Sequence, residues 1–555
     1  MHPFQKFAVE CKDTVKKYRI NLEKPPKEIG ADLALPCFAL AKKLKKSPQE
    51  IAKDIASGIE KGMKKGLIKK VEAAGPYVNF YADWDKLGKT IIKEILKDDE
   101  KYGSANKKEK IMIEYSSPNS NKPLHVGHLR NGSIGMSMAN ILSFSGNNVI
   151  KANLVNDRGI HICKVMVAYE KFAGGKTPDK KSDHFVGDLY VLYHKNEDDQ
   201  LKKEAYEMLK KWEEHDKKAI TLWKKINKWT IEGIKQTYKT FGSDFDVWFF
   251  ESEFYDKAKP LINEALKKKV FFKHEEGAIV AKLEPELANK VVLRSDGTST
   301  YATNDLPLTK HKFEHFKLNK AIWIVGSEQN LYFQQLFKIF ELLGYKWAGN
   351  CHHLSHGMVN LPSGKMKSRE GTVIDADDLI EEVKELAKKE IKERYPNISG
   401  KELEERAMDI GLGAIKYYLL KIEPIRDILF DSEKAVAFEG DTGPYLQYTH
   451  ARAFSIVKKS KKKAKVESLD GEKEINIIKK LSAFSEIVEK CANELKPNYL
   501  ANYLSELAIM FNEYYHSQKV IGSENEEARL AMVAAVRTVL RNGLQLLGIK
   551  PLEKM

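Results

Sequence analysis

The chain has 555 residues, which is enough for three or four domains with sizeable cores. Hydrophobic residues make up 42% of it and charged residues 31%, a balance that describes a soluble globular protein and excludes a disordered one. The formal net charge of +15 favours a polyanionic partner, most simply a nucleic acid. Solvated, Lys-rich helix faces would produce the same excess, so charge alone does not decide between the two.

The five cysteines are scattered, without a C-x-x-C pair or a cluster with histidine: Cys11, Cys37, Cys163, Cys351 and Cys491. This spacing argues against a zinc module or a disulfide framework and fits a reducing cytosol. The N-terminus lacks an uninterrupted apolar core, and no stretch is long and apolar enough to span a bilayer. We therefore expect a cytoplasmic protein without membrane contact and without a metal site built from protein ligands.

Residues 1–105 are predicted to form a small α/β domain. Ser47-Pro48-Gln49-Glu50 is a capping box with proline at the first helical position, and residues 77–80 alternate as a strand does. Lysines beside its apolar faces would suit phosphate contacts, but a solvated face is at least as good an interpretation. A charged helical connector, residues 83–108, leads to the next domain.

Residues 111–142 carry the strongest local pattern in the chain. An apolar run ending in Glu114 predicts a buried parallel strand, and a polar turn rich in Ser, Pro and Asn follows it. The sequence HVGH at residues 125–128 then opens a helical segment. Phosphates bind at the helix N-terminus of such strand–turn–helix units, where two imidazoles one turn apart can face them together. A lone H-x-x-H more often marks structural histidines or a partial metal site, so the motif needs support from elsewhere.

Alternating strands and helices predict a multidomain α/β protein whose residues 106–380 form a doubly wound, Rossmann-like parallel sheet. Residues 148–159 are expected to form a buried strand that ends in a polar, glycine-containing turn, and residues 321–326 another buried strand. Long Lys/Glu-rich helices and short strands interrupt the alternation between about residues 165 and 290. We interpret that stretch as an insertion between the two halves of the nucleotide-binding fold.

A charged motif lies late in the same domain. The sequence SGKMKSREG at residues 363–371 has glycine near both ends and three cationic side chains in five positions. A short basic loop is usually only solvated, but one close to the switch point of a doubly wound sheet is well placed to bind an anion.

After about residue 377 nothing strand-like remains. We expect a helical connector over residues 381–430 and an all-α helical bundle over residues 431–555. Aromatic residues recur in the bundle at helical spacing: Tyr499, Tyr503, Phe511, Tyr514 and Tyr515. Most should be core, and a few exposed ones beside lysines would stack on unpaired bases.

The HVGH motif and the KMKSR loop together resemble the two signatures, HIGH and KMSKS, of class I aminoacyl-tRNA synthetases. Three stretches narrow the resemblance to the arginyl-tRNA synthetases: EYSSPN…KPLHVGH at residues 114–128, GPYLQY at residues 443–448 and LGIKPLEKM at residues 547–555. The resemblance covers nearly the whole chain. It implies that the N-terminal domain contacts the corner of the tRNA, that the helical bundle binds the anticodon, and that the chain works as a monomer.

The resemblance implies an arginine–tRNA ligase, which joins L-arginine to the α-phosphate of ATP and then transfers it to the 3′-terminal ribose of tRNA(Arg). The implied ATP-binding residues are Gly127, His125, His128, Met358, Lys365 and Ser368. His125 and His128 would stabilise the α-phosphate, and Gly127 would lie under the adenosine. Lys365 would meet the β- and γ-phosphates as the loop closes. Mg²⁺ would accompany the ATP.

One position departs from the family pattern, because Ser368 stands where the second signature usually has its second lysine. Many arginyl enzymes share this form, and Lys122 matches the upstream lysine thought to replace it. We therefore count Lys122 as catalytic, beside the histidine pair and Lys365. Arg369 or Lys367 are alternative sources of the same charge.

The family positions that line the arginine pocket are Glu114, Asn119, Tyr301, Asp305 and Gln329. A guanidinium is best held by carboxylates in a fork geometry, so Asp305 is expected to pair with it, with Tyr301 and Gln329 taking its other donors. Glu114 and Asn119 are assigned to the α-amino and carboxylate end. Glu114 and Asp305 are expected at strand ends, and the alternative is that both form structural ion pairs.

Other interpretations are weaker. A cysteinyl synthetase should show zinc-ligand spacing, and a glutamyl synthetase would want basic groups in place of Glu114 and Asp305. A catalytically inactive, tRNA-binding paralogue usually loses the histidine pair or the loop lysine, and both are present here. A general nucleotidyltransferase would not explain the long helical tail.

Overall fold

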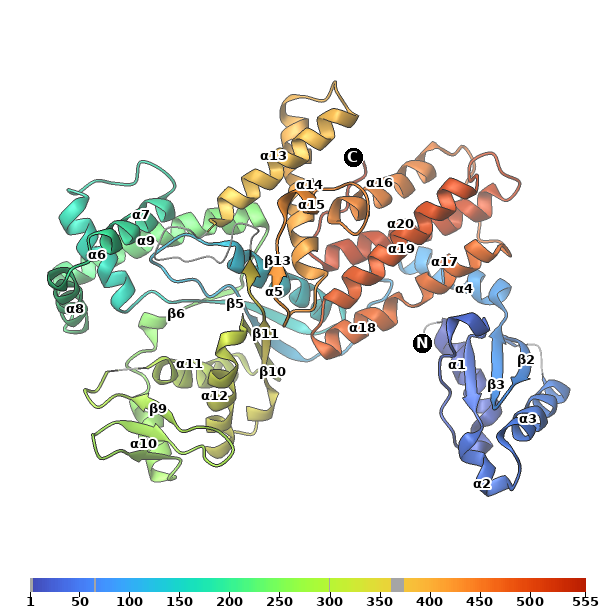
Figure 1. Ribbon diagram of the computed structural model, residues 1–555, viewed down its shortest axis with the longest axis horizontal. Helices are drawn as coiled ribbons and strands as arrows, with labels where there is room; N and C mark the ends of the chain where they lie inside the picture. Colours follow the sequence, from blue (N-terminus) through green and yellow to red (C-terminus); the bar gives the residue numbers. More distant parts are fainter. Residues whose placement is uncertain (1–2, 64–65, 299, 361–373) are drawn as a thin grey trace.

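The computed structural model describes residues 3–63, 66–298, 300–360 and 374–555 (Figure 1). An N-terminal α/β domain, a central parallel sheet with helices, two inserted subdomains and a C-terminal helical bundle follow one another along the chain. This confirms the predicted multidomain α/β architecture. Among the described residues there is no helix whose length and apolarity would let it cross a membrane.

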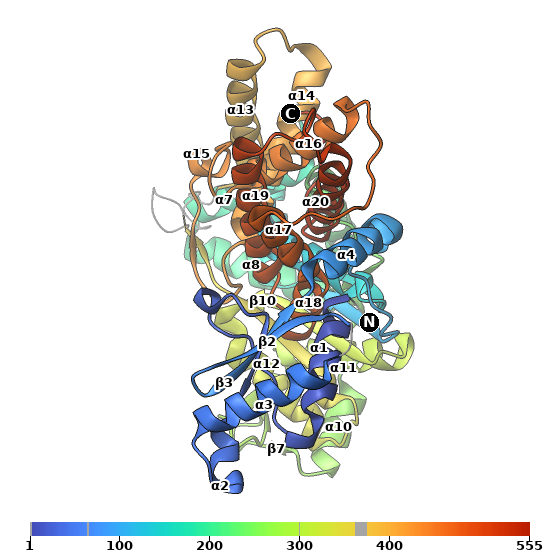
Figure 2. The same cartoon turned by 90° about the vertical axis from the view of Figure 1, so that its right-hand side faces the viewer.

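The N-terminal domain is a three-stranded antiparallel sheet, in the order β1-β3-β2, with helices packed against it. Its main elements are α1 (Pro3–Val15), β1 (Leu33–Pro36), α2 (Ala41–Leu44), α3 (Pro48–Gly62), β2 (Ile68–Ala74) and β3 (Tyr77–Ala82). The predicted capping box is confirmed: Glu50 N donates to Ser47 Oγ, and Ser47 N donates to a Glu50 oxygen. Figure 2 shows this domain beside the helical bundle. The next helix, α4 (Trp84–Asp98), packs against α17 and α20 of the bundle and leads along the chain to the central sheet.

The central domain contains five parallel strands in the order β11-β10-β4-β5-β6. They are β4 (Lys110–Glu114), β5 (Asn148–Val155), β6 (Val247–Phe250), β10 (Lys320–Gly326) and β11 (Cys351–His356). The strands predicted at residues 111–113, within 148–159 and at 321–326 are therefore confirmed. The strand order reverses between β4 and β10, so the switch point, where open α/β sheets bind ligands, lies at the carboxyl ends of these two strands.

Two subdomains interrupt the central sheet. The first is helical and has its own core: α6 (Ile160–Phe172), α7 (Ser182–Lys195), α8 (Asp199–Glu213) and α9 (Lys217–Phe241). The second contains α10 (Lys259–Lys267) and an antiparallel sheet of β7 (Phe271–Lys273), β8 (Ile279–Ala281) and β9 (Lys290–Leu293). The helices around the sheet are α5 (Val126–Phe144), α11 (Tyr301–Phe316) and α12 (Asn330–Leu342).

The remaining described elements are almost entirely helical: α13 (Ala376–Arg394), α14 (Gly400–Leu420), α15 (Ser432–Ala435), α16 (Gly443–Lys459), α17 (Glu472–Ser482), α18 (Phe484–Glu494), α19 (Asn498–Ser517) and α20 (Glu526–Leu546). The helices α13 and α14 project as a hairpin at the top of Figure 1.

Two details of the prediction are wrong. A two-residue strand, β13 (Ile428–Leu429), pairs in parallel with β12 (Val359–Asn360), although no strand was expected so late in the chain. Two residues are too few to leave a hydropathy pattern, and the pairing depends on contacts from distant segments. Asp305 lies in α11 rather than at a strand end, because Thr300 N donates to Thr303 Oγ1 and starts a helix there.

Gly135 on α5 provides a test of the packing between this helix and β4. A Cβ atom at Gly135 would lie 2.2 Å from Tyr115 Cγ, and the Tyr115 ring is fixed by Phe245 and by a hydrogen bond to Asp244 O. We expect Gly135→Ala to destabilise the protein by about 1–3 kcal/mol and to lower its thermal midpoint.

Gly58→Ala is the matched control, since Gly58 also lies in a helix but no described residue comes within 4 Å of the added methyl group. It should leave the midpoint unchanged or raise it slightly. Equal midpoints for both variants would contradict the packing described for α5.

Candidate active site

The turn between β4 and α5 is held in a strained conformation. Ser116 and Ser117 have φ values of 72° and 47°, in the left-handed region that costs a residue other than glycine about 1–3 kcal/mol. Two buried asparagines fix the turn: Ser116 N donates to Asn131 Oδ1 (2.6 Å), and Ser117 N donates to Asn153 Oδ1 (3.1 Å). The path of the chain at the switch point is therefore set by side chains of α5 and β5.

The two histidines of the HVGH motif form the N-terminal cap of α5. Gly127 N donates to His125 Nδ1 (3.2 Å), and His125 N donates to His128 Nδ1 (3.1 Å). Because each Nδ1 accepts a hydrogen bond from a backbone N–H, each neutral ring carries its proton on Nε2. The ring centroids lie 4.0 Å apart, and a Cβ atom at Gly127 would lie 3.0 Å from the His125 ring. Glycine at this position therefore leaves room for the pair.

Burial keeps both rings uncharged. It lowers the pKa of His125 to about 3, with a smaller contribution from the Lys122 ammonium. It also lowers the pKa of His128 well below its usual value, assisted by His125 and Lys122. Burial lowers the pKa of Lys122 as well. The pair therefore presents two neutral N–H donors beside a cation, an arrangement suited to an anion.

The chain that follows residues 361–373 is attached directly to the HVGH motif. Ala376 N donates to Leu124 O (2.9 Å), and Val126 N donates to Ile374 O (3.4 Å). The second motif itself, including Lys365, Lys367, Ser368 and Arg369, lies outside the described residues, so these predictions stay predictions. On the other flank, Met358 has an exposed side chain while its main chain is fixed, since Met358 N donates to Asp427 Oδ1.

Glu114 forms a buried ion pair that the sequence interpretation treated as the alternative. Lys312 Nζ donates to Glu114 Oε2 (2.6 Å), and both side chains are almost fully buried. The ammonium also lies over the Trp323 and Phe249 rings. The charge of Glu114 is thus neutralised within the protein, which leaves other carboxylates to receive a cationic ligand.

Two further carboxylates lie near enough to influence one another electrostatically: Glu251, directly after β6, and Asp305 on α11. Burial raises the pKa of Glu251 to about 7, with nearby Asp305 adding to the effect, and raises the pKa of Asp305 to about 6. Tyr332 donates its hydroxyl hydrogen bond to Asp305 Oδ2. We call Glu251 and Asp305 the acidic cluster. A permanently charged cation that binds here would restore both carboxylates to the ionised form.

The other predicted pocket residues lie on three different elements. Tyr301 begins α11 with its side chain 71% exposed, close enough for Glu251 and Asp305 to raise its pKa, although burial is the main cause. Asn119 is exposed on the strained turn, next to the end of β5, where it bridges to Asn156. Gln329 follows β10 at the switch point and is half-buried. All three lie near the carboxyl edge of the sheet.

Three family models match successive parts of the chain. They are described as the arginyl tRNA synthetase N-terminal domain (residues 4–82), the catalytic domain of class I tRNA synthetases (R) (residues 91–432) and the DALR anticodon binding domain (residues 446–555). The arginine–tRNA ligase of Treponema denticola is 43% identical over 99% of this chain and 97% of its own length. The chain belongs to the arginyl-tRNA synthetase family.

Other relatives agree with this assignment. The arginine–tRNA ligase of Borrelia turicatae is 41% identical over 99% of this chain and 97% of its own. The solved arginyl-tRNA synthetase of Thermus thermophilus superposes with a TM-score of 0.81, at 26% identity, over 99% of this chain and all of its own. The fold and the family predicted from the sequence are therefore confirmed.

Sequence reasoning missed several residues of this arginyl-tRNA synthetase fold. Glu251 was overlooked, although a carboxylate directly after a strand is a recognisable signal. Arg130 was also overlooked: it is fully buried and donates to the carbonyl oxygens of Met358, Pro424 and Arg426. Only its place in a helix of small and apolar residues could have drawn attention to it. Through its hydrogen bond to Met358 O, Arg130 fixes the main chain of a residue that is a predicted ATP contact.

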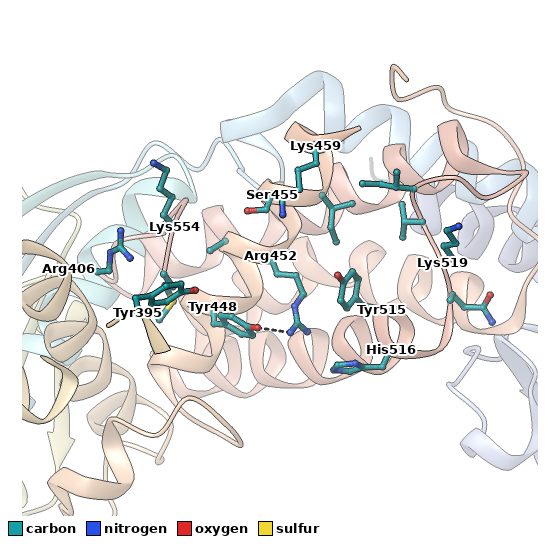
Figure 3. A pocket seen from close by; sticks show the side chains of 16 residues that line it. Tyr395, Arg406, Tyr448, Arg452, Ser455, Lys459, Tyr515, His516, Lys519 and Lys554 are labelled. Atoms are coloured by element: carbon teal, nitrogen blue, oxygen red, sulfur yellow. Dashed lines mark hydrogen bonds between the residues drawn. The ribbon is translucent and has the colours of Figure 1, made fainter. Parts of the chain in front are cut away.

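The helical bundle of this family member contains a basic cavity of about 780 Å³ (Figure 3). Within the described part of the chain its lining has no acidic residue and five cations: Arg406, Arg452, Lys459, Lys519 and Lys554. Arg452 lies over the rings of Tyr448 and Tyr515 and donates to Tyr448 Oη (2.8 Å). The predicted division of bundle aromatics is confirmed, since Tyr515 is 40% exposed whereas Tyr503 and Tyr514 are buried. We call this site the bundle cavity.

Proposed function

We propose that this chain is an arginine–tRNA ligase, which activates L-arginine with ATP, releases pyrophosphate and transfers arginine to the 3′-terminal ribose of tRNA(Arg). The observation that carries the proposal is the pairing of two sites at one sheet edge, in a chain of the arginyl-tRNA synthetase family. The neutral histidine pair suits a phosphate, and the acidic cluster suits a guanidinium. An inactive tRNA-binding paralogue would have no need of either.

In this proposal His125 and His128 bind the α-phosphate of ATP through their Nε2–H groups. The arginine carboxylate attacks the α-phosphorus, a bond to the bridging oxygen breaks, and pyrophosphate leaves. Negative charge that builds on the α-phosphate is stabilised by the two donors and by Lys122. Gly127 and Met358 face the adenosine, and Lys365 and Ser368 are assigned to the phosphates from the second motif.

The arginine side chain is proposed to lie between Glu251 and Asp305, with Tyr301 and Gln329 taking its remaining donors. Asn119 is assigned to the α-amino and carboxylate end, and Glu114 acts there together with Lys312. A neutral side chain would leave two desolvated carboxylates unpaired, which provides discrimination in favour of arginine.

Mg²⁺ is proposed to arrive with the ATP phosphates. Among the residues that the structure describes, one group could offer three metal ligands, namely Asp183, His184 and Asp377. It does not fit a cation, because Lys181 Nζ already donates to Asp183 (2.9 Å) and Asp377 (2.6 Å). Mg²⁺ is usually held by substrate phosphates and few protein ligands, so the proposal places it on the ATP phosphates.

The tRNA is proposed to contact the bundle cavity, where exposed tyrosines offer stacking surfaces for unpaired bases and lysines offer phosphate contacts. The N-terminal domain is proposed to contact the corner of the tRNA. The five cysteines are all free and buried, which supports the expected cytoplasmic location. A monomeric state remains a prediction.

The first test is pyrophosphate exchange into ATP with each of the twenty amino acids, with and without unfractionated tRNA. We expect exchange with arginine alone, and the family resemblance predicts that tRNA is required. Exchange with another amino acid would overturn the substrate assignment. No exchange under any condition would favour the inactive paralogue.

A second test concerns the acidic cluster. Asp305→Asn should raise the KM for arginine about 100-fold, because one of two carboxylates facing the guanidinium loses its charge. The KM for ATP and the affinity for tRNA should stay within about twofold. Equal losses in all three measurements would show that Asp305 is structural.

The acidic cluster also determines how arginine binding depends on pH. Because both pKa values are raised, protons occupy the cluster in part below pH 7 and compete with the guanidinium. Arginine affinity of the unsubstituted enzyme should therefore rise between about pH 5.5 and 8. In Asp305→Asn this rise should move to lower pH, because the Asp305 charge helps to raise the pKa of Glu251. Calorimetric titration at several pH values measures both curves.

A third test addresses the bundle cavity. Tyr515→Ala should weaken tRNA binding about tenfold through the loss of one stacking surface. Lys519→Ala should reduce the salt dependence of binding by about one counterion. Tyr499→Ala is the control, since Tyr499 lies on the same helix but outside the cavity. Filter binding that ranks Tyr499→Ala with Tyr515→Ala would argue against the cavity as the contact.

A further inference from the structure

Glu251 lies on a turn whose main chain is fixed from the neighbouring strand. It is the first residue of a short 3₁₀ helix, η5 (Glu251–Glu253), directly after β6. Asp157, at the end of β5, accepts hydrogen bonds from Ser252 N (2.9 Å) and Ser252 Oγ (2.7 Å). Asp157 is only 3% exposed, so this connection is made inside the protein. The Cα of Glu251 is thereby held at the carboxyl edge of the sheet.

The Glu251 carboxylate is held by a second residue, on a different element. Asn304 of α11 donates from Nδ2 to Glu251 Oε1 (2.6 Å). Asn304 is 6% exposed, and its Oδ1 has no hydrogen-bond partner among the described residues. If the Asn304 amide were flipped, its oxygen would lie against the Glu251 carboxylate. The hydrogen bond to Glu251 therefore fixes the orientation of the Asn304 amide.

An unpaired buried oxygen is unfavourable for stability, and an apolar side chain of similar volume would avoid it. The amide at position 304 is therefore better explained by what it does to Glu251 than by packing. Asn304 and Asp305 follow one another on α11 and so point in different directions, about 100° apart. One orients a carboxylate of the acidic cluster, and the other supplies the second carboxylate.

We propose that Asn304 is a positioning residue that sets the Glu251 carboxylate for bidentate pairing with the guanidinium of the substrate. This inference rests on the proposed function. A guanidinium–carboxylate pair needs a coplanar approach, so a carboxylate free to rotate would bind it less well. Asn304 acts through Glu251 and does not itself touch the substrate.

Other charged and titratable groups surround Glu251 and bear on its ionisation. They are Asp157 and Arg158 after β5, Asp305 and Tyr301 on α11, and Tyr332 on α12. Arg158 and the Asn304 amide favour the ionised carboxylate, whereas the two aspartates disfavour it. Loss of the Asn304 donor should therefore move the pH dependence of arginine binding to higher pH, in addition to weakening binding.

The test uses Asn304→Leu in the full chain with tRNA. We expect a KM for arginine about tenfold higher in pyrophosphate exchange, with the KM for ATP unchanged and the thermal midpoint unchanged or raised. Calorimetric titration of arginine should show the shift to higher pH. Asn304→Ala, which is smaller, gives the same comparison if the leucine variant does not fold.

Asn498→Leu is the matched control, because Asn498 on α19 is also a buried asparagine with an unpartnered Oδ1. Its KM for arginine should equal that of the unsubstituted chain. An unchanged KM for arginine in both Asn304 variants overturns this inference, as does an equal rise in the KM for ATP. Failure of the unsubstituted chain to exchange with arginine overturns the proposed function and this inference together.

Discussion

The amide of Asn131 is the contact on which the geometry of the active site depends. Its Oδ1 accepts from Ser116 N in the strained turn, while its Nδ2 donates to Ile324 O of β10 and lies 3.2 Å from His356 Nε2 at the end of β11. One side chain of α5 thus joins both strands of the switch point to the helix that carries the histidine pair. The strain at Ser116 and Ser117 is tolerated because their backbone N–H groups are held by the side chains of Asn131 and Asn153.

A second set of contacts extends this geometry toward the helical bundle. Arg130, next to Asn131, is fully buried and bonds to carbonyl oxygens on both sides of the short parallel pair formed by β12 and β13. Among the residues that the structure describes, no carboxylate forms an ion pair with its guanidinium, although Asp427 lies near enough to favour its charge. Burying an arginine with neutral partners is costly. We therefore assign Arg130 the role of holding the segments before β12 and β13 together, rather than of adding stability. Through Arg130, helix α5 is joined both to the segment before β12 and to the segment before β13.

Much of this organisation could be predicted because it is local in the sequence. Apolar runs ending in polar turns marked β4, β5 and β10, and the HVGH motif marked the start of α5. Residues that depend on long-range pairing could not be found in this way. Glu114 has the same appearance in the sequence whether or not Lys312 neutralises it, and nothing near Glu251 shows that Asp305 will lie close enough to influence its ionisation. The helical position of Asp305 was missed because a capping pair of threonines is a weaker signal than a strand pattern.

Burial shifts the pKa values of the basic groups and of the acidic cluster in opposite directions, and in both cases it favours the uncharged form. It lowers the pKa values of His125, His128 and Lys122 and raises those of Glu251 and Asp305. Each set of groups therefore carries less charge without ligand than its residue types suggest. A phosphate anion favours the charged form of the cationic groups, and a guanidinium favours the charged form of the carboxylates. Each ligand thus offsets part of the desolvation that its own site imposes, so a neutral competitor of the same shape gains nothing from either site.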